Sequence, residues 1–137
     1  INYHIYGSPK YLEKNGFPKN ISDLNKHSFI SFGKGAPSPV YNPDWALKLG
    51  TKDNKKRKTV MKVNSVYGLL LAVQSGVGLA ALPDYITVNQ PNIVKVLPNI
   101  EGPITEAHFV YPQSMKNVAR VQAFRNFLYS KISEWEF

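Results

Sequence analysis

Apolar runs separated by glycine and proline divide the chain into alternating strand-like and helix-like segments. Alternation of apolar and polar residues is typical of strands, whereas apolar residues three or four positions apart are typical of helices. The predicted strands are residues 2–6, 28–32, 45–49, 59–63, 78–82, 93–97 and 106–111. The predicted helices are residues 9–15, 64–74, 83–89 and 116–133. A further short turn of helix is expected to begin after Ser22, its N-cap, and to end at residue 24. This order indicates an α/β fold.

Residues 64–83 are the most informative segment, an apolar helix that runs into a Gly-x-Gly turn and a short strand. In a dinucleotide-binding fingerprint the glycines follow a strand and precede a helix, and here that order is reversed. Gly76 suits the left-handed position after a helix, and Gly78 suits a sharp turn. Asn64 and Ser65 can each cap a helix N-terminus that faces a ligand. A plain buried helix–strand unit is the alternative, and this segment leaves both open.

Composition places the chain among folded globular domains. It has 137 residues, of which 43% are hydrophobic and 12% aromatic. These values fit one domain with a core of its own. No apolar run approaches the ~20 residues that a bilayer-spanning helix needs. Cysteine is absent, which excludes disulfides and thiolate metal sites. Because the chain opens at Ile1 without a methionine or a visible signal peptide, we expect a piece of a longer protein. The absence of cysteine is compatible with the cytoplasm, where we expect this protein.

Half of the net charge of +8 lies within residues 52–58. Five basic residues less Asp53 give +4 there; they are Lys52, Lys55, Lys56, Arg57 and Lys58. The run lies between two predicted strands, residues 45–49 and 59–63, and is therefore expected to be the exposed tip of a hairpin. A loop that contacts phosphates is the alternative. No aromatic residue interleaves with these charges and no recognition helix follows them.

No set of residues in the sequence suggests catalysis. His4, His27 and His108 are far apart and lie in or beside predicted strands, where a histidine is usually packed or at the surface. The sequence has no zinc-binding histidine pair and no phosphate-binding loop. Ser75 closes a helix and so does not fit a nucleophile elbow. The sequence therefore predicts a binding domain, not an enzyme, with no metal and no cofactor.

The predicted C-terminal helix carries an apolar stripe at three- and four-residue spacing. The stripe consists of Val118, Val121, Phe124, Leu128 and Ile132, and Phe127 and Trp135 widen it. Such a face must be buried against something. It packs either on the sheet of the same domain or on a part of the protein outside this chain, and the sequence leaves both open.

Short motifs in a fixed order along nearly the whole chain resemble those of a known family. YGSPKYL at 6–12, GFP at 16–18, SDL at 22–24 and His27 match the pattern "SPxYL…xxGxP…xDL…H". QSGVGLAALP at 74–83 is similar to "aaxGxGiaxLP", with Trp45 and residues 63–65 at fitting places between. Tyr111, Pro112 and VQAFRNFL at 121–128 are similar to the closing "vyP…vraFxdFl". These are motifs of LysR-type transcriptional regulators.

This resemblance implies a subdomain related to type 2 periplasmic binding proteins, a mixed-sheet sandwich with helices on both faces. The family's winged helix-turn-helix, linker helix and first effector subdomain have no counterpart in this chain. Residues 1–112 would be the second effector-binding subdomain, and residues 113–137 the C-terminal helix that returns to the first. The implied partners are a small-molecule effector and, through the missing helix-turn-helix, DNA. We also expect a homo-oligomer, dimeric through residues 116–133, and no membrane contact.

Ligands of open α/β sheets bind outside the carboxyl ends of the strands, near helix N-termini. The first candidates on this rule are Phe32, Gly33, Lys34, Asn64 and Ser65, and the weaker ones are Ser8 and Tyr41. Helix N-termini together with a lysine would favour an anionic ligand. The alternatives are that the lysine is a solvated loop residue and that the phenylalanine belongs to the core.

Three function classes follow. The first is the effector-sensing domain of a regulator. The second is a lobe of a periplasmic solute-binding protein, which shares the fold and would need a signal peptide upstream. The third is a basic nucleic-acid-binding domain that uses residues 52–58 directly.

Overall fold

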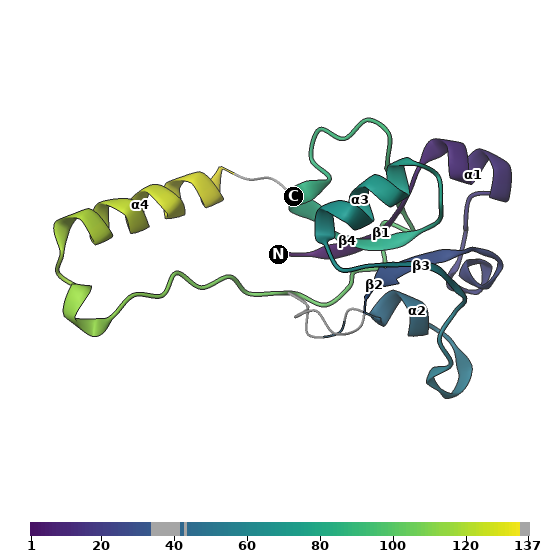
Figure 1. The fold of residues 1–137 in the computed structure, drawn as a ribbon, viewed down its shortest axis with the longest axis horizontal. Helices are drawn as coiled ribbons and strands as arrows, with labels where there is room; N and C mark the ends of the chain where they lie inside the picture. The colour runs from purple at the N-terminus through teal and green to yellow at the C-terminus, as the bar shows by residue number, and fades with distance from the viewer. Residues whose placement is uncertain (34–41, 43, 135–137) are drawn as a thin grey trace. The chain divides into compact units, whose positions relative to one another are not determined.

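The computed structural model describes residues 1–33, 42 and 44–134 (Figure 1). The chain divides into two compact units, Ile1–Thr105 and Glu106–Phe137. All β-strands of the described residues lie in the first unit, and the second contains the long C-terminal helix.

Strand β1 (Tyr3–Gly7) lies at the centre of a three-stranded antiparallel sheet. Its neighbours are β4 (Ala80–Pro83) and β5 (Val94–Val96). A second sheet pairs β2 (Phe29–Phe32) with β3 (Thr59–Val63) in parallel. The predicted strands around these positions are therefore confirmed within one or two residues at their ends.

The two sheets are joined by a parallel bridge between Phe29 and Leu79. The N–H of Ile30 donates to the Leu79 carbonyl at 2.8 Å, and the Leu79 N–H donates to the Ser28 carbonyl at 2.9 Å. The strand order is thus β3-β2-β4-β1-β5, with β2, β3 and β4 parallel and β1 running the opposite way. A Cβ at Gly78 would lie 2.6 Å from the Ser28 carbonyl oxygen, so glycine lets these backbones approach. The sharp turn expected at Gly78 lies just before it, at residues 75–77, where Gly76 has a positive φ.

Helices cover both faces of the sheet, as expected. Tyr3 and Ile5 of β1 point into one core, which includes residues of α1 (Pro9–Asn15) and of the 3₁₀ helix η1 (Ile21–Lys26). Tyr6 points into a second core. The helix on that side is α3 (Val66–Gln74), which contributes Leu69, Leu70, Ala72 and Val73 (Figure 1). Alternate residues of one strand therefore serve two cores.

The ends of α1 and α3 follow the sequence signals. The hydroxyls of Ser8 and Ser65 each accept a hydrogen bond, at 3.3 Å, from the N–H three residues further on. Gly16 and Gly76 follow these helices with φ of 86° and 79°, a conformation that glycine adopts at little cost. These caps confirm both predicted helices.

The predicted strand over residues 45–49 is wrong. The segment forms α2 (Trp45–Lys48), in which Trp45, Ala46 and Leu47 are all buried. An alternating strand could not bury three consecutive side chains on one side. The predicted hairpin is also wrong, because β3 pairs in parallel with β2 and the connecting segment contains the 3₁₀ helix η2 (Lys52–Asn54).

Three smaller expectations are corrected. Helix η1 is capped by Asn20, whose side-chain oxygen accepts from the Asp23 N–H at 3.1 Å, and not by Ser22. Helix η3 (Asp84–Ile86) is shorter than the predicted residues 83–89. Residues 106–111 do not form a strand, since they have no strand partner among the described residues.

The second unit contains the 3₁₀ helix η4 (Gln113–Met115) and α4 (Ala119–Ser133). No residue of α4 is buried. The ring of Phe109 lies 5.6 Å from that of Phe124 and 5.4 Å from that of Tyr111. Trp135 lies outside the described residues. Within the described ranges, none of the helices combines the length and hydropathy that a membrane crossing needs.

Candidate ligand-binding edge

Four of the predicted ligand residues meet at one end of the sheet. Phe32 and Val63 are register partners at the carboxyl ends of β2 and β3. The N–H of Gly33 donates to the Val63 carbonyl at 2.9 Å. Asn64 and Ser65 follow β3 directly and lead into α3. A Cβ at Gly33 would lie 3.8 Å from Asn64, so the two strand ends are in contact there.

This edge combines accessible polar groups with a supported aromatic side chain. Asn64 and Ser65 are exposed, and Phe32 and Gly33 are half-buried. Phe32 packs against the core that α3 covers. It therefore supports the edge from the core while part of its surface remains accessible.

The N-terminus of α3 gives the edge a positive electrostatic potential. The Ser65 hydroxyl satisfies the Gly68 N–H. The N–H groups of Val66 and Tyr67 have no hydrogen-bond partner among the described residues, as is usual in the first turn of a helix. These free donors and the helix dipole favour a negatively charged group at this place.

The remaining three predicted residues do not join this cluster. Ser8 lies at the opposite end of the sheet, because β1 runs antiparallel to β4. Its side chain is buried and caps α1, and a Cβ at Gly76 would lie 3.6 Å from its hydroxyl. Lys34 and Tyr41 lie outside the described residues.

A buried polar network that the sequence did not predict lies between β1, η3 and β5. The Asp84 carboxylate is 4% exposed. Its oxygens lie 2.9 and 2.8 Å from Nδ1 of His4, and it accepts from the Tyr6 hydroxyl at 2.9 Å and from Lys95 Nζ at 3.2 Å. Burial, with a further contribution from Asp84, raises the pKa of the Tyr6 phenol. Thr87 donates to the Tyr6 hydroxyl at 3.1 Å.

These contacts satisfy the Asp84 carboxylate within the protein and fix η3 to two strands. The network is therefore a structural clamp. Two signals for it were present in the sequence, an acid directly after an apolar strand and two polar residues, His4 and Tyr6, on one face of β1. The described residues contain no group of three His, Cys, Asp or Glu side chains arranged to hold a metal.

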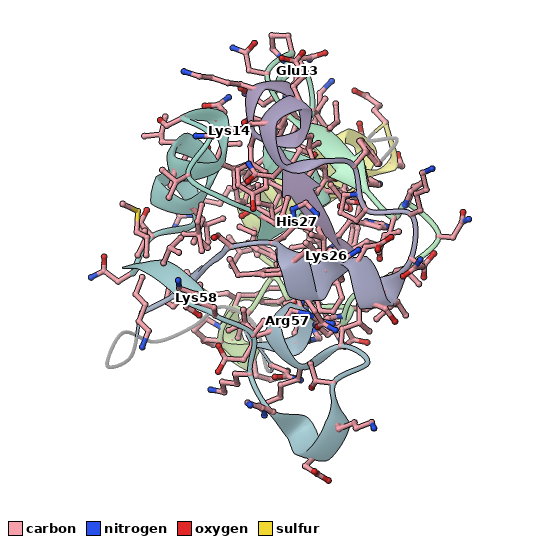
Figure 2. The ribbon with its side chains drawn as sticks, turned by 90° about the vertical axis from the view of Figure 1, so that its right-hand side faces the viewer. Glu13, Lys14, Lys26, His27, Arg57 and Lys58 are labelled. Atoms are coloured by element: carbon pink, nitrogen blue, oxygen red, sulfur yellow. The ribbon has the colours of Figure 1, made fainter. Side chains whose placement is uncertain are left out.

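Arg57 departs from the expected exposed basic loop, since its side chain is 7% exposed. Its Nε donates to the Asn25 side-chain oxygen at 2.9 Å, its Nη1 to the Ala46 carbonyl at 3.0 Å, and its Nη2 to the Ile21 carbonyl at 3.3 Å. Figure 2 shows it between η1 and the loop that continues to Lys58. The other basic residues of the run are exposed.

The amino-acid sequence matches a known protein family over nearly its whole length. The family model described as "LysR substrate binding domain" matches residues 2–132. The chain belongs to this family. A Haemophilus influenzae protein described as an uncharacterized HTH-type transcriptional regulator is 33% identical over 113 residues, which are 80% of this chain and 38% of that protein.

Solved structures of regulators from other bacteria share the fold. The regulatory domain of CrgA, a LysR-type transcriptional regulator from Neisseria meningitidis, gives a TM-score of 0.70 at 22% identity, covering 95% of this chain and 64% of that one. The effector domain of the transcriptional regulator AmpR from Pseudomonas aeruginosa gives 0.62 at 18% identity, covering 93% and 59%. The chain thus spans less than two thirds of each of these relatives.

Proposed function

We propose that this domain senses a small anionic molecule as part of a bacterial transcription regulator. The observation that supports it most is the meeting of Phe32, Gly33, Asn64 and Ser65 at the N-terminus of α3. Backbone N–H groups at a helix N-terminus bind carboxylates and phosphates without a cationic side chain. Lys34 is an additional candidate from the sequence alone, as is Tyr41.

The edge is one wall of a site. Small ligands are usually 70–90% buried in a complete site, whereas Asn64 and Ser65 are exposed here. We propose that residues 1–112 form the second effector-binding subdomain and that a first subdomain supplies the opposite wall. Residues 113–137 would then pack on that first subdomain. The share of its relatives that this chain spans supports such an arrangement.

The regulator is favoured over the other two function classes. A solute-binding lobe shares the fold, but the family match and the name of the Haemophilus relative both support a regulator. A domain that works only through its basic run is disfavoured, because the guanidinium of Arg57 is engaged inside the protein. We propose a cytoplasmic, homo-oligomeric protein without enzymatic activity or cofactor that reads DNA sequence through a separate helix-turn-helix.

Paired serine variants of the full-length protein test the ligand site. The effector is first identified as the small carboxylate or phosphate that raises the Tm. We expect Ser65→Ala to weaken its binding by about tenfold or more in calorimetry, since a hydrogen bond to a charged group contributes about 1.5–3 kcal/mol. Ser8→Ala is the matched control, because it removes the same kind of helix cap at the other end of the sheet. Equal affinities of both variants and the wild type would exclude the site proposed here.

A further inference from the structure

A groove of about 590 Å³ on the first unit is lined by basic residues, uncharged polar residues and one glycine. Its basic residues are Lys52, Lys55, Lys56, Arg57 and Lys58, and the others are Ser22, Asn25, Gly50 and Thr51. Among the described residues, no carboxylate, aromatic or aliphatic side chain lines it. The groove shares no residue with the proposed ligand-binding edge.

Three of the five cations are free to bind a partner. Arg57 is held by three protein oxygens, and Lys56 forms an ion pair with Asp44. The side chains of Lys52, Lys55 and Lys58 are exposed and have no hydrogen-bond or ion-pair partner among the described residues (Lys58 is labelled in Figure 2). Asp53, in the same stretch, does not line the groove.

The backbone that carries these lysines is fixed to the rest of the first unit. The guanidinium of Arg57 binds both η1 and α2, and the backbone N–H of Arg57 donates to the Leu47 carbonyl at 2.9 Å. Gly50 has φ of 64°, and a Cβ there would lie 2.4 Å from Ile21. The loop therefore lies directly on η1, and the charges are presented from a defined support.

This lining favours the phosphates of a duplex over other polyanions. Protein–protein interfaces have an apolar centre from which lysine is depleted, and single-stranded nucleic acids require aromatic platforms. Neither is present in this groove. Lysines act as point charges that neutralise backbone phosphates without reading bases. We propose that this groove binds the phosphate backbone of duplex DNA without sequence preference. In a regulator it would add affinity beside the site that reads the sequence.

Salt dependence measures how many phosphates the groove neutralises. We titrate a fluorescent duplex with this chain and follow anisotropy at several salt concentrations. We expect dissociation constants between about 10⁻⁶ and 10⁻⁴ M at physiological salt, equal for two unrelated sequences. The plot of the logarithm of the association constant against the logarithm of salt concentration has a negative slope. In the variant Lys52→Gln/Lys55→Gln/Lys58→Gln this slope should be shallower by about three, close to one for each lost phosphate contact.

A control of equal charge separates the groove from the net charge. Lys10, Lys14 and Lys116 are also exposed, and Figure 2 shows Lys14 well away from Arg57 and Lys58. Lys10→Gln/Lys14→Gln/Lys116→Gln should keep the wild-type slope, and both triple variants should keep the wild-type Tm. An equal loss of slope in both variants, or no loss in the first, would overturn the proposal.

Two competitors test the chemical class of the partner. The competitors are polyglutamate and phosphatidylglycerol vesicles, each at the same concentration of charge as the duplex. If polyglutamate binds with the same dependence on the three groove lysines, the partner is an acidic protein; if the vesicles do, it is a membrane. Either result would overturn the assignment to DNA. Submicromolar, sequence-selective binding would overturn it as well. Ser65→Ala should leave duplex binding unchanged, so a failure of the proposed ligand site is distinguishable from a failure of this groove.

Discussion

Arg57 joins its own loop to two helices of the first unit, η1 and α2, through its guanidinium. It donates to oxygens of Ile21, Asn25 and Ala46, and no carboxylate forms an ion pair with it among the described residues. Burial lowers the pKa of this guanidinium. Arg57→Met should reduce the free energy of unfolding by about 1–3 kcal/mol, because buried acceptors lose their donors. Urea denaturation measures this. Lys58→Met, at an exposed neighbour, should change it by less than about 0.5 kcal/mol; equal losses would contradict the role given to Arg57.

His27 couples stability to pH. Its side chain is buried, its Nδ1 has no hydrogen-bond partner among the described residues, and its ring lies 5.7 Å from that of Tyr11. Burial lowers the pKa of His27 below the ordinary 6.5, and the positive charge of Lys26 lowers it further. The negative charge of Asp23 acts in the opposite direction and does not cancel these two effects. The unfolded chain therefore takes up the proton at higher pH than the folded one. Stability is full above pH 6.5 and is lost as pH falls from there through the folded pKa.

We expect the free energy of unfolding to fall between about pH 7 and 5, and to fall less in His27→Gln, which cannot be protonated. Denaturation at several pH values measures this, and NMR titration of the His27 ring gives the folded pKa directly. The lowered pKa of Asp23, which accepts a hydrogen bond from the Lys19 N–H, also makes acid destabilising, but only below its ordinary value of 3.8. The same slope in both proteins over the upper range would refute the role of His27.

At the scale of elements, the junction between the two sheets depends on Gly78. A Cβ there would lie 2.6 Å from the Ser28 carbonyl oxygen, a backbone atom that cannot move without disturbing β2. Gly78→Ala should therefore lower the free energy of unfolding by about 1–3 kcal/mol. Gly33→Ala is the matched control, since its new methyl would have its nearest neighbours at 3.8 Å. Thermal unfolding of the two variants compares them, and similar losses would show that the junction tolerates a side chain.

Elements with a local signal could be predicted from the sequence, and elements set by distant contacts could not. Capping serines and following glycines marked α1 and α3. The segment of α2 alternates like a strand, yet the core buries three consecutive side chains there. The prediction of a hairpin was wrong for a related reason. Strand β3 pairs with β2, which lies about 30 residues earlier in the chain, and not with the segment directly before it. The contacts of Asp84 with His4 and Tyr6 span 80 and 78 residues, so the sequence showed polar residues in and beside strands but not that they contact one another.

The candidate site shows the same division. Phe32, Gly33, Asn64 and Ser65 come together because the ends of neighbouring parallel strands meet, which a general rule predicts. Ser8 satisfies the local part of that rule, a strand followed by a helix start. It lies at the other end of the sheet because β1 is antiparallel, and strand direction is decided by pairing across the whole chain.

At the scale of the whole molecule, none of the described residues of the second unit, 106–134, is buried. Among the apolar residues of α4, Phe124, Phe127 and Ile132 are about half exposed, at 51%, 54% and 49%. Val121 and Leu128 are half-buried. Burying one such side chain contributes roughly 1.5–3 kcal/mol before ordering costs. A stripe of this size is therefore expected to find a partner, which in the complete regulator we propose to be the first subdomain.

In this chain alone, we expect the stripe to pair with a second copy, since the same helix then supplies both apolar faces and the segment after Pro112 can exchange between chains. Sedimentation should show a dimer that Phe124→Asp dissociates without lowering the Tm of the first unit, because a charge cannot be buried unpaired in an apolar interface. Asn126→Asp, which adds the same charge at an exposed polar position of α4, should leave the dimer intact. A monomer at high concentration for all three proteins would mean that α4 does not mediate self-association. Dissociation by both variants would mean that net charge, and not the apolar stripe, controls it.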